Sequence, residues 1–156
     1  MRPAVAAVLA GLAAPVGAGE VGLEACLADT DRPADCIGSL AGSCMAARPD
    51  GESTLGMVEC IGVETAAWDG LLNATYRAVM ESARDADATG DVLSEEHTRV
   101  ATLRDAQRAW IAFRDADCLA QAARWGLGSL GQVSAANCLL SMTAERTIHL
   151  RGLLEP

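Results

Sequence analysis

The chain has 156 residues, with 21 Asp and Glu against 12 basic residues, all of them Arg, and a formal net charge of −9. This length fits one domain with one modest core. The acidic balance argues against nucleic acid or an anionic membrane surface as a partner, and leaves a basic protein as a plausible one.

The first residues have the order of a secretory signal. Arg2 is followed by an apolar run over 3–16, and small residues end at Ala18, where a signal peptidase would cleave. The run is too short to span a membrane as a helix, and no second apolar run follows. We therefore predict a signal peptide over 1–18 and a periplasmic or secreted protein.

A lipid anchor through Cys26 is the alternative. The segment 23–26 faintly resembles a lipoprotein processing site. However, Glu20 and Glu24 lie between the apolar run and the cysteine, and lipidation would leave five of the six cysteines for disulfides. A protein without a lipid anchor is the better interpretation.

Residues 19–52 lack periodicity and are rich in Gly, Pro, Asp and Cys, which predicts an irregular cap with at most one or two short helical turns. Residues 53–156 form the predicted helical domain. Ser53 or Thr54 caps its first helix, which extends to about Arg84 because apolar residues recur at helical spacing. The turn that follows is expected over 85–91.

Two more helices are predicted. Ser94 caps one that ends near Trp125, and the other extends from about Gln132 to Leu153. Trp125, beside a glycine-rich loop, is the tryptophan expected to be exposed. No alternating β-branched run occurs, so the predicted fold is all-α, with three long antiparallel helices and a disulfide-rich N-terminal cap.

Six cysteines in an exported chain predict three disulfides. Antiparallel helices place Cys60, Cys118 and Cys138 at one level of the bundle. This favours Cys118–Cys138 between the last two helices and Cys44–Cys60 between the cap and the first helix, while Cys26–Cys36 would close a small loop in the cap. An exchange to Cys60–Cys118 with Cys44–Cys138 fits the same geometry almost as well. Zinc is disfavoured, because no Cys-x-x-Cys pair is present and the compartment is oxidising.

Three segments together carry a family resemblance: Cys60 with 68–76, the continuous stretch 103–118, and positions spread over 128–150. They resemble the lysozyme inhibitor LprI-like domain, a family of exported bacterial helical proteins, over about 44–150. The resemblance implies a protein-binding domain, because a lipid-anchored member inhibits lysozyme, whereas most members have no assigned activity. The motif residues are Trp68, Asp69, Leu72, Asn73, Tyr76, Leu103, Gln107, Trp110, Arg114, Asp115 and Arg146.

These motif residues are predicted to be structural. Gln107, Trp110 and Arg114 are spaced three and four apart and share one helix face. A buried polar side chain needs a partner. We therefore expect Gln107 and Arg114 to contact Asp69, Asn73 or a helix-end carbonyl. Trp68 and Trp110 are expected in the core.

The candidate partner-binding residues are acidic and cluster around the first predicted turn. They could steer the chain toward a cationic lysozyme, although a solvated turn is the simpler interpretation. These residues are Glu81, Asp85, Asp87, Asp91, Glu95 and Glu96. No catalytic set, cofactor site or metal site is expected. The alternative to lysozyme inhibition is a structural or stress-related periplasmic protein with an unknown partner.

Overall fold

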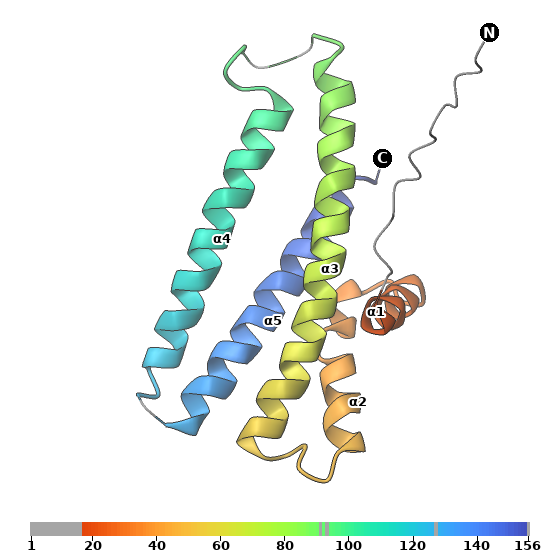
Figure 1. The fold of residues 1–156 in the computed structure, drawn as a ribbon. Helices are drawn as coiled ribbons and strands as arrows, with labels where there is room; N and C mark the ends of the chain where they lie inside the picture. Colours follow the sequence, from red (N-terminus) through yellow and green to blue (C-terminus); the bar gives the residue numbers. More distant parts are fainter. Residues whose placement is uncertain (1–16, 91, 93, 127, 156) are drawn as a thin grey trace, which may run out of the picture.

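The computed structural model describes residues 17–90, 92, 94–126 and 128–155; the predicted signal peptide lies almost entirely outside them. The described chain is all-α and contains no strand. Its elements, shown in Figure 1, are α1 (Ala18–Ala28), the 3-10 helix η1 (Pro33–Cys36), α2 (Ser39–Ala47), α3 (Thr54–Asp87), α4 (Arg99–Ala123) and α5 (Ser129–Gly152). None of the described helices combines the length and the hydropathy that a membrane span requires.

The longest helix, α3, is the centre of the fold (Figure 1). Helix α5 packs along much of α3, whereas α1 and α2 pack against α3 on the side away from α4. Helix α4 contacts mainly α5 and touches α3 less. The three long helices are antiparallel in sequence order, as predicted from their short connections.

The N-terminal segment is more ordered than the sequence predicted. Instead of an irregular cap, it contains two α-helices of 11 and 9 residues and a 3-10 turn. The reason lies outside the segment. Glu64 of α3 accepts hydrogen bonds from the backbone nitrogens of Gly38 and Ala41, each at 2.7 Å, and so caps the N-terminus of α2.

The boundaries of the long helices also differ from expectation. Ser53 caps α3 through Gly56, as predicted, but α3 continues to Asp87 instead of ending near Arg84. Ser94 is not the cap of α4, because its hydroxyl accepts from the nitrogen of His97 in a separate turn. Thr98 caps α4 through the nitrogen of Ala101.

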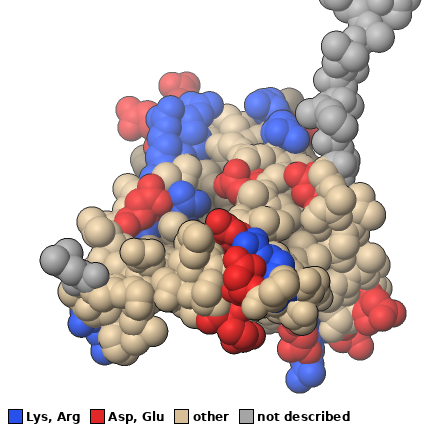
Figure 2. All heavy atoms as spheres, turned by 60° about the horizontal axis from the view of Figure 1, so that its bottom comes forward, with Lys and Arg blue, Asp and Glu red and all other residues tan. Residues whose placement is uncertain are grey.

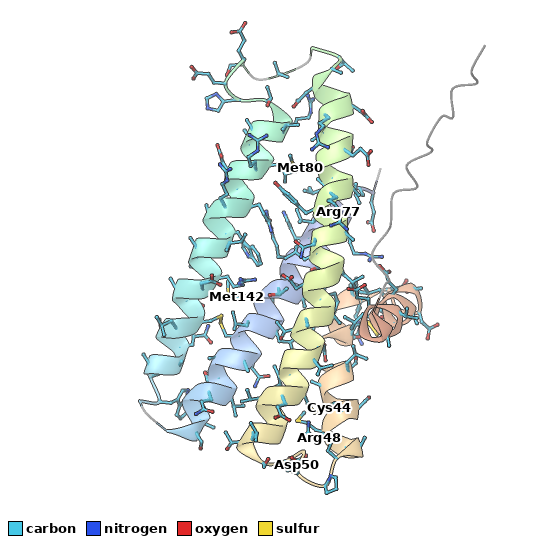
Figure 3. All side chains as sticks on the ribbon, viewed as in Figure 1. Cys44, Arg48, Asp50, Arg77, Met80 and Met142 are labelled. Atoms are coloured by element: carbon cyan, nitrogen blue, oxygen red, sulfur yellow. A yellow bond between two sulfur atoms is a disulfide. The ribbon has the colours of Figure 1, made fainter. Side chains whose placement is uncertain are left out.

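Three disulfides connect neighbouring elements. Cys26–Cys36 joins α1 to η1, Cys44–Cys60 joins α2 to α3, and Cys118–Cys138 joins α4 to α5. These are the favoured pairs, and the alternative exchange is not present. The sulfur of Met142, between α4 and α5 in Figure 3, lies 3.8 Å from both sulfurs of the Cys118–Cys138 bridge.

The core divides into two clusters. The larger one centres on Trp68 and brings Leu23 of α1 against α3 and α5. The smaller one contains Leu72, Val79 and Leu150, with Tyr76, Leu103 and Trp110 packed around it. Among the described residues of α4, only Gln107 and Cys118 are buried. Helix α4 is therefore held by fewer buried contacts than α3 or α5.

Candidate functional site

A groove lies between the C-terminal half of α3, the N-terminal half of α4 and the C-terminal half of α5. It has a volume of about 560 Å³ and mostly apolar walls, which include Val79, Ala83, Leu103, Ala106 and Leu153. Its charged or titratable lining residues are Arg99, Arg146 and His149, and no described carboxylate lines it. We call this feature the interhelical groove.

At the level where Arg146 lines the groove, one tryptophan is flanked by two arginines. The guanidinium carbons of Arg114 and Arg146 lie 5.1 and 5.7 Å from the ring centroid of Trp110, within the range of cation–π attraction. The Nε of Arg146 also donates a 2.9 Å hydrogen bond to the Oε1 of Gln107. We call Gln107, Trp110, Arg114 and Arg146 the Trp110 cluster.

The two arginines of this cluster differ in their partners. Arg114 donates to Asp115 at 2.9 Å and to Thr143 at 3.4 Å. No described carboxylate pairs with Arg146, and partial burial lowers the pKa of its guanidinium by removing water, with the Tyr76 hydroxyl acting weakly in the opposite direction. Arg146 is therefore a partly desolvated cation that forms no ion pair with a carboxylate of the described residues.

The predicted partners of Gln107 and Arg114 were wrong. Asp69 and Asn73 are exposed and hydrogen-bond each other at 2.9 Å. Helix α5 packs between α4 and the buried face of α3, so the polar groups of α4 meet Arg146 and Thr143 instead. The remaining motif residues are placed as follows: Trp68 and Leu72 are buried, Leu103 and Tyr76 are partly buried, and Asp115 is exposed.

The profile of the family described as "Lysozyme inhibitor LprI" matches residues 44–150. The chain belongs to the lysozyme inhibitor LprI family. It is also 33% identical over 97 residues to "Uncharacterized protein R02472" of Rhizobium meliloti (strain 1021), covering 62% of this chain and 70% of that protein. No solved structure matched significantly. The LprI region begins at Cys44 in α2, so α1 and η1 precede it.

Within the LprI region, sequence reasoning missed Glu64. Its side chain is fully buried and accepts from the indole nitrogen of Trp68 at 3.0 Å in addition to the two nitrogens of α2. The sequence did contain a signal for this role: Glu64 is an acidic residue on the apolar face of α3, between Ile61 and Trp68. Its three donors make Glu64 a structural group that joins α2 to the LprI bundle.

The acidic candidates divide into two groups. Glu81, Asp85, Glu95 and Glu96 are exposed near the α3–α4 connection, and we call these four the acidic tip. No basic side chain in the described ranges forms an ion pair with them. Asp91 lies outside the described residues.

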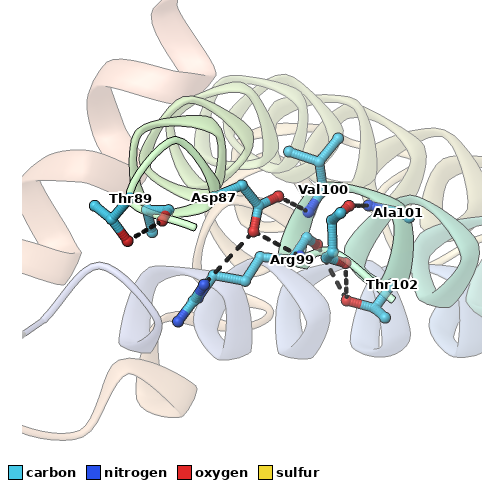
Figure 4. Close-up of polar contacts among 8 residues, drawn as sticks. Asp87, Thr89, Arg99, Val100, Ala101 and Thr102 are labelled. Atoms are coloured by element: carbon cyan, nitrogen blue, oxygen red, sulfur yellow. Dashed lines mark hydrogen bonds and ion pairs between the residues drawn. The ribbon is translucent and has the colours of Figure 1, made fainter. Parts of the chain in front are cut away.

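Asp87, in contrast, has a structural position. Its side chain is 14% exposed, and its carboxylate accepts from the backbone nitrogens of Val100 at 3.0 Å and Arg99 at 2.9 Å (Figure 4). Hydrogen bonding from Val100 is the largest factor that lowers the pKa of Asp87; the contacts with Arg99 add to it, and burial partly opposes it. Asp87 therefore holds the N-terminus of α4 against α3, and we remove it from the partner-binding candidates.

Proposed function

We propose that this protein is an exported inhibitor that binds lysozyme through its helical LprI domain and catalyses no reaction itself. The observation that carries the proposal is the family match over 44–150, which spans the C-terminal part of α2, all of α3 and α4, and most of α5. The family is described by an inhibitory activity, and inhibition requires a contact surface and no reaction chemistry.

The acidic tip is the proposed contact surface for lysozyme. Its four exposed carboxylates come from the end of α3 and the connection to α4, and Arg84 is the basic residue within 81–96. Figure 2 turns the opposite end of the bundle forward, where acidic and basic side chains lie next to one another, as in the pairs of Arg48 with Asp50 and Glu59. Uncompensated negative charge favours association with a cationic protein.

The proposed compartment is the periplasm or the exterior of the cell. The signal-like sequence over 1–18 supports export. The three disulfides support an oxidising environment, since such bonds are rare in a reducing cytosol. Because Cys26 is paired with Cys36, a lipid anchor at Cys26 would require a different pairing, which supports the unanchored form.

The test is a cell-wall turbidity assay with a cationic lysozyme and the oxidised protein spanning 19–156. Inhibition should saturate with the protein at a fixed stoichiometry. The tip variant carries Glu81→Gln, Asp85→Asn, Glu95→Gln and Glu96→Gln. It should bind lysozyme at least about tenfold more weakly at low salt, with a smaller difference at high salt because ions screen exposed charges.

A matched control changes four exposed acids away from the tip, with the same change in net charge: Asp29→Asn, Asp31→Asn, Glu52→Gln and Glu145→Gln. Equal losses in both variants would assign the effect to overall charge and overturn the proposed surface. An absence of inhibition by the unmodified oxidised protein would overturn lysozyme inhibition itself. A structural or stress-related role with another partner would then be preferred.

A further inference from the structure

The interhelical groove has a composition unlike that of the surrounding protein surface. The chain is acidic overall, yet the described residues that line the groove include three basic or titratable side chains and no carboxylate. Its volume of about 560 Å³ falls within the range of about 300–1,000 Å³ that is typical of small-molecule sites. A cationic protein such as lysozyme is poorly suited to this groove, so it requires a different occupant.

Arg146 is the cation best placed for a ligand. Arg99 is engaged by Asp87, whereas no described carboxylate pairs with Arg146. The hydrogen bond from Nε to Gln107 and the stacking on Trp110 hold the guanidinium in one orientation. The Nη groups remain as the donors that a carboxylate can use, and arginine binds carboxylates with particular geometric complementarity.

The apolar walls extend from the Arg146 level toward the α3–α4 connection. Val79 and Ala86 mark the two ends of the wall on α3, seven residues apart, which corresponds to about 10 Å of helix. On α5, the lining likewise begins at Arg146 and ends at the apolar side chain of Leu153. The site thus has Arg146 at one end and mostly apolar side chains along its length, while Arg99, which is paired with Asp87, lines it at the start of α4.

We propose that the interhelical groove binds a medium-chain amphipathic carboxylate, with its carboxylate on Arg146 and its alkyl chain along the walls formed by α3, α4 and α5. Burial of the alkyl chain supplies most of the affinity, and Arg146 sets the orientation and the preference for an anion. The groove shares no lining residue with the acidic tip, so the two proposals are tested by different variants and can fail independently.

Isothermal titration of the oxidised protein with decanoate below its micelle concentration tests the proposal. One decanoate should bind per chain, and octanoate should bind about tenfold more weakly, because each buried methylene contributes about fourfold in affinity. Decyltrimethylammonium, with the same chain and the opposite charge, should bind at least about tenfold more weakly than decanoate. Equal binding of the two head groups would overturn the assignment of Arg146.

Two variants locate the site. Arg146→Gln should weaken decanoate binding at least about tenfold. Ala106→Trp fills the groove without changing Arg146 and should abolish binding, whereas Ala109→Trp, at an exposed position on the same helix that does not line the groove, should leave binding unchanged. Circular dichroism checks that each variant is folded. Full decanoate binding by folded Ala106→Trp would place the ligand elsewhere and overturn the proposal.

Discussion

The indole nitrogen of Trp68 donates a 3.0 Å hydrogen bond to the Oε1 of Glu64, one helical turn earlier in α3, and both side chains are fully buried. The same carboxylate binds the backbone nitrogens of Gly38 and Ala41 at the start of α2. One buried carboxylate therefore accepts hydrogen bonds both from the largest aromatic side chain of the core and from the N-terminus of a neighbouring helix.

Replacement of Glu64 should strongly destabilise the protein. Glu64→Ala leaves three donors without an acceptor, two of them buried, and the free energy of unfolding should fall by about 3–5 kcal/mol. Urea denaturation of the oxidised protein, followed by far-UV circular dichroism, measures this loss. Glu145→Ala, an exposed acid on α5, is the control and should change stability by less than about 0.5 kcal/mol. A loss at Glu64 as small as that of the control would contradict a structural role.

Asp87 should make the stability of the protein depend on acidic pH. Its pKa in the folded protein is lowered, chiefly by the hydrogen bond from Val100, so its contribution is complete above the unfolded pKa of about 4 and disappears as pH falls through the folded pKa. Asp87→Asn should lower the urea midpoint at pH 6 and reduce the further decrease between pH 4 and pH 2.

The control for this pH series is Asp85→Asn, which changes an exposed acid that caps no helix and lies two residues before Asp87. The Asp85 variant should retain the acid-dependent decrease of the unmodified protein. If Asp87→Asn also retained it in full, the carboxylate of Asp87 would not be the group that links α4 to α3 in a pH-dependent way.

The hydrogen bond between Gln107 and Arg146 should appear as an energetic coupling across α4 and α5. In a double-mutant cycle with Gln107→Ala and Arg146→Ala, we expect a coupling of about 1 kcal/mol, because the bond involves a charged donor that is only partly buried. A parallel cycle between Gln107 and Asn73 should give a value near zero. A larger coupling of Gln107 with Asn73 than with Arg146 would support Asn73, the partner predicted from the sequence alone.

The Cys118–Cys138 disulfide should be especially important for α4. Because this helix buries only Gln107 and Cys118 among its described residues, the bridge to α5 is one of its few firm attachments. Replacing both cysteines by Ala should lower the free energy of unfolding by about 3 kcal/mol. Amide hydrogen exchange should then increase more in α4 than in α3.

The matched variant for this experiment removes the Cys26–Cys36 bridge, again with two Ala substitutions. It should increase exchange in α1 and η1 and leave α4 protected, because that bridge lies on the opposite side of α3. Equal exchange in α4 for the two variants would show that the Cys118–Cys138 bridge has no local effect on that helix.

The periodic segments could be predicted from the sequence with good accuracy, whereas the polar contacts could not. Apolar spacing located α3, α4 and α5. Antiparallel geometry favoured Cys44–Cys60 and Cys118–Cys138 without excluding their exchange, and the structure contains the favoured pairs. The partner of Gln107 was misplaced because periodicity identifies the buried face of a helix but does not say which neighbour packs there. Glu64 was missed for the same reason: two of its three donors, the backbone nitrogens of α2, are 23–26 residues away.

The sequence by itself determined an all-helical, disulfide-linked protein and predicted a signal peptide, because helical periodicity, cysteine count and signal-like composition are local properties of the chain. Only the tertiary structure decided that Asp87 is a cap and that Arg146 stacks on Trp110. It also decided that residues 18–47 contain two α-helices and a 3-10 helix. Each of these depends on groups that are distant in sequence and become neighbours when α3, α4 and α5 pack, and hydrogen bonds and ion pairs act only over such short distances.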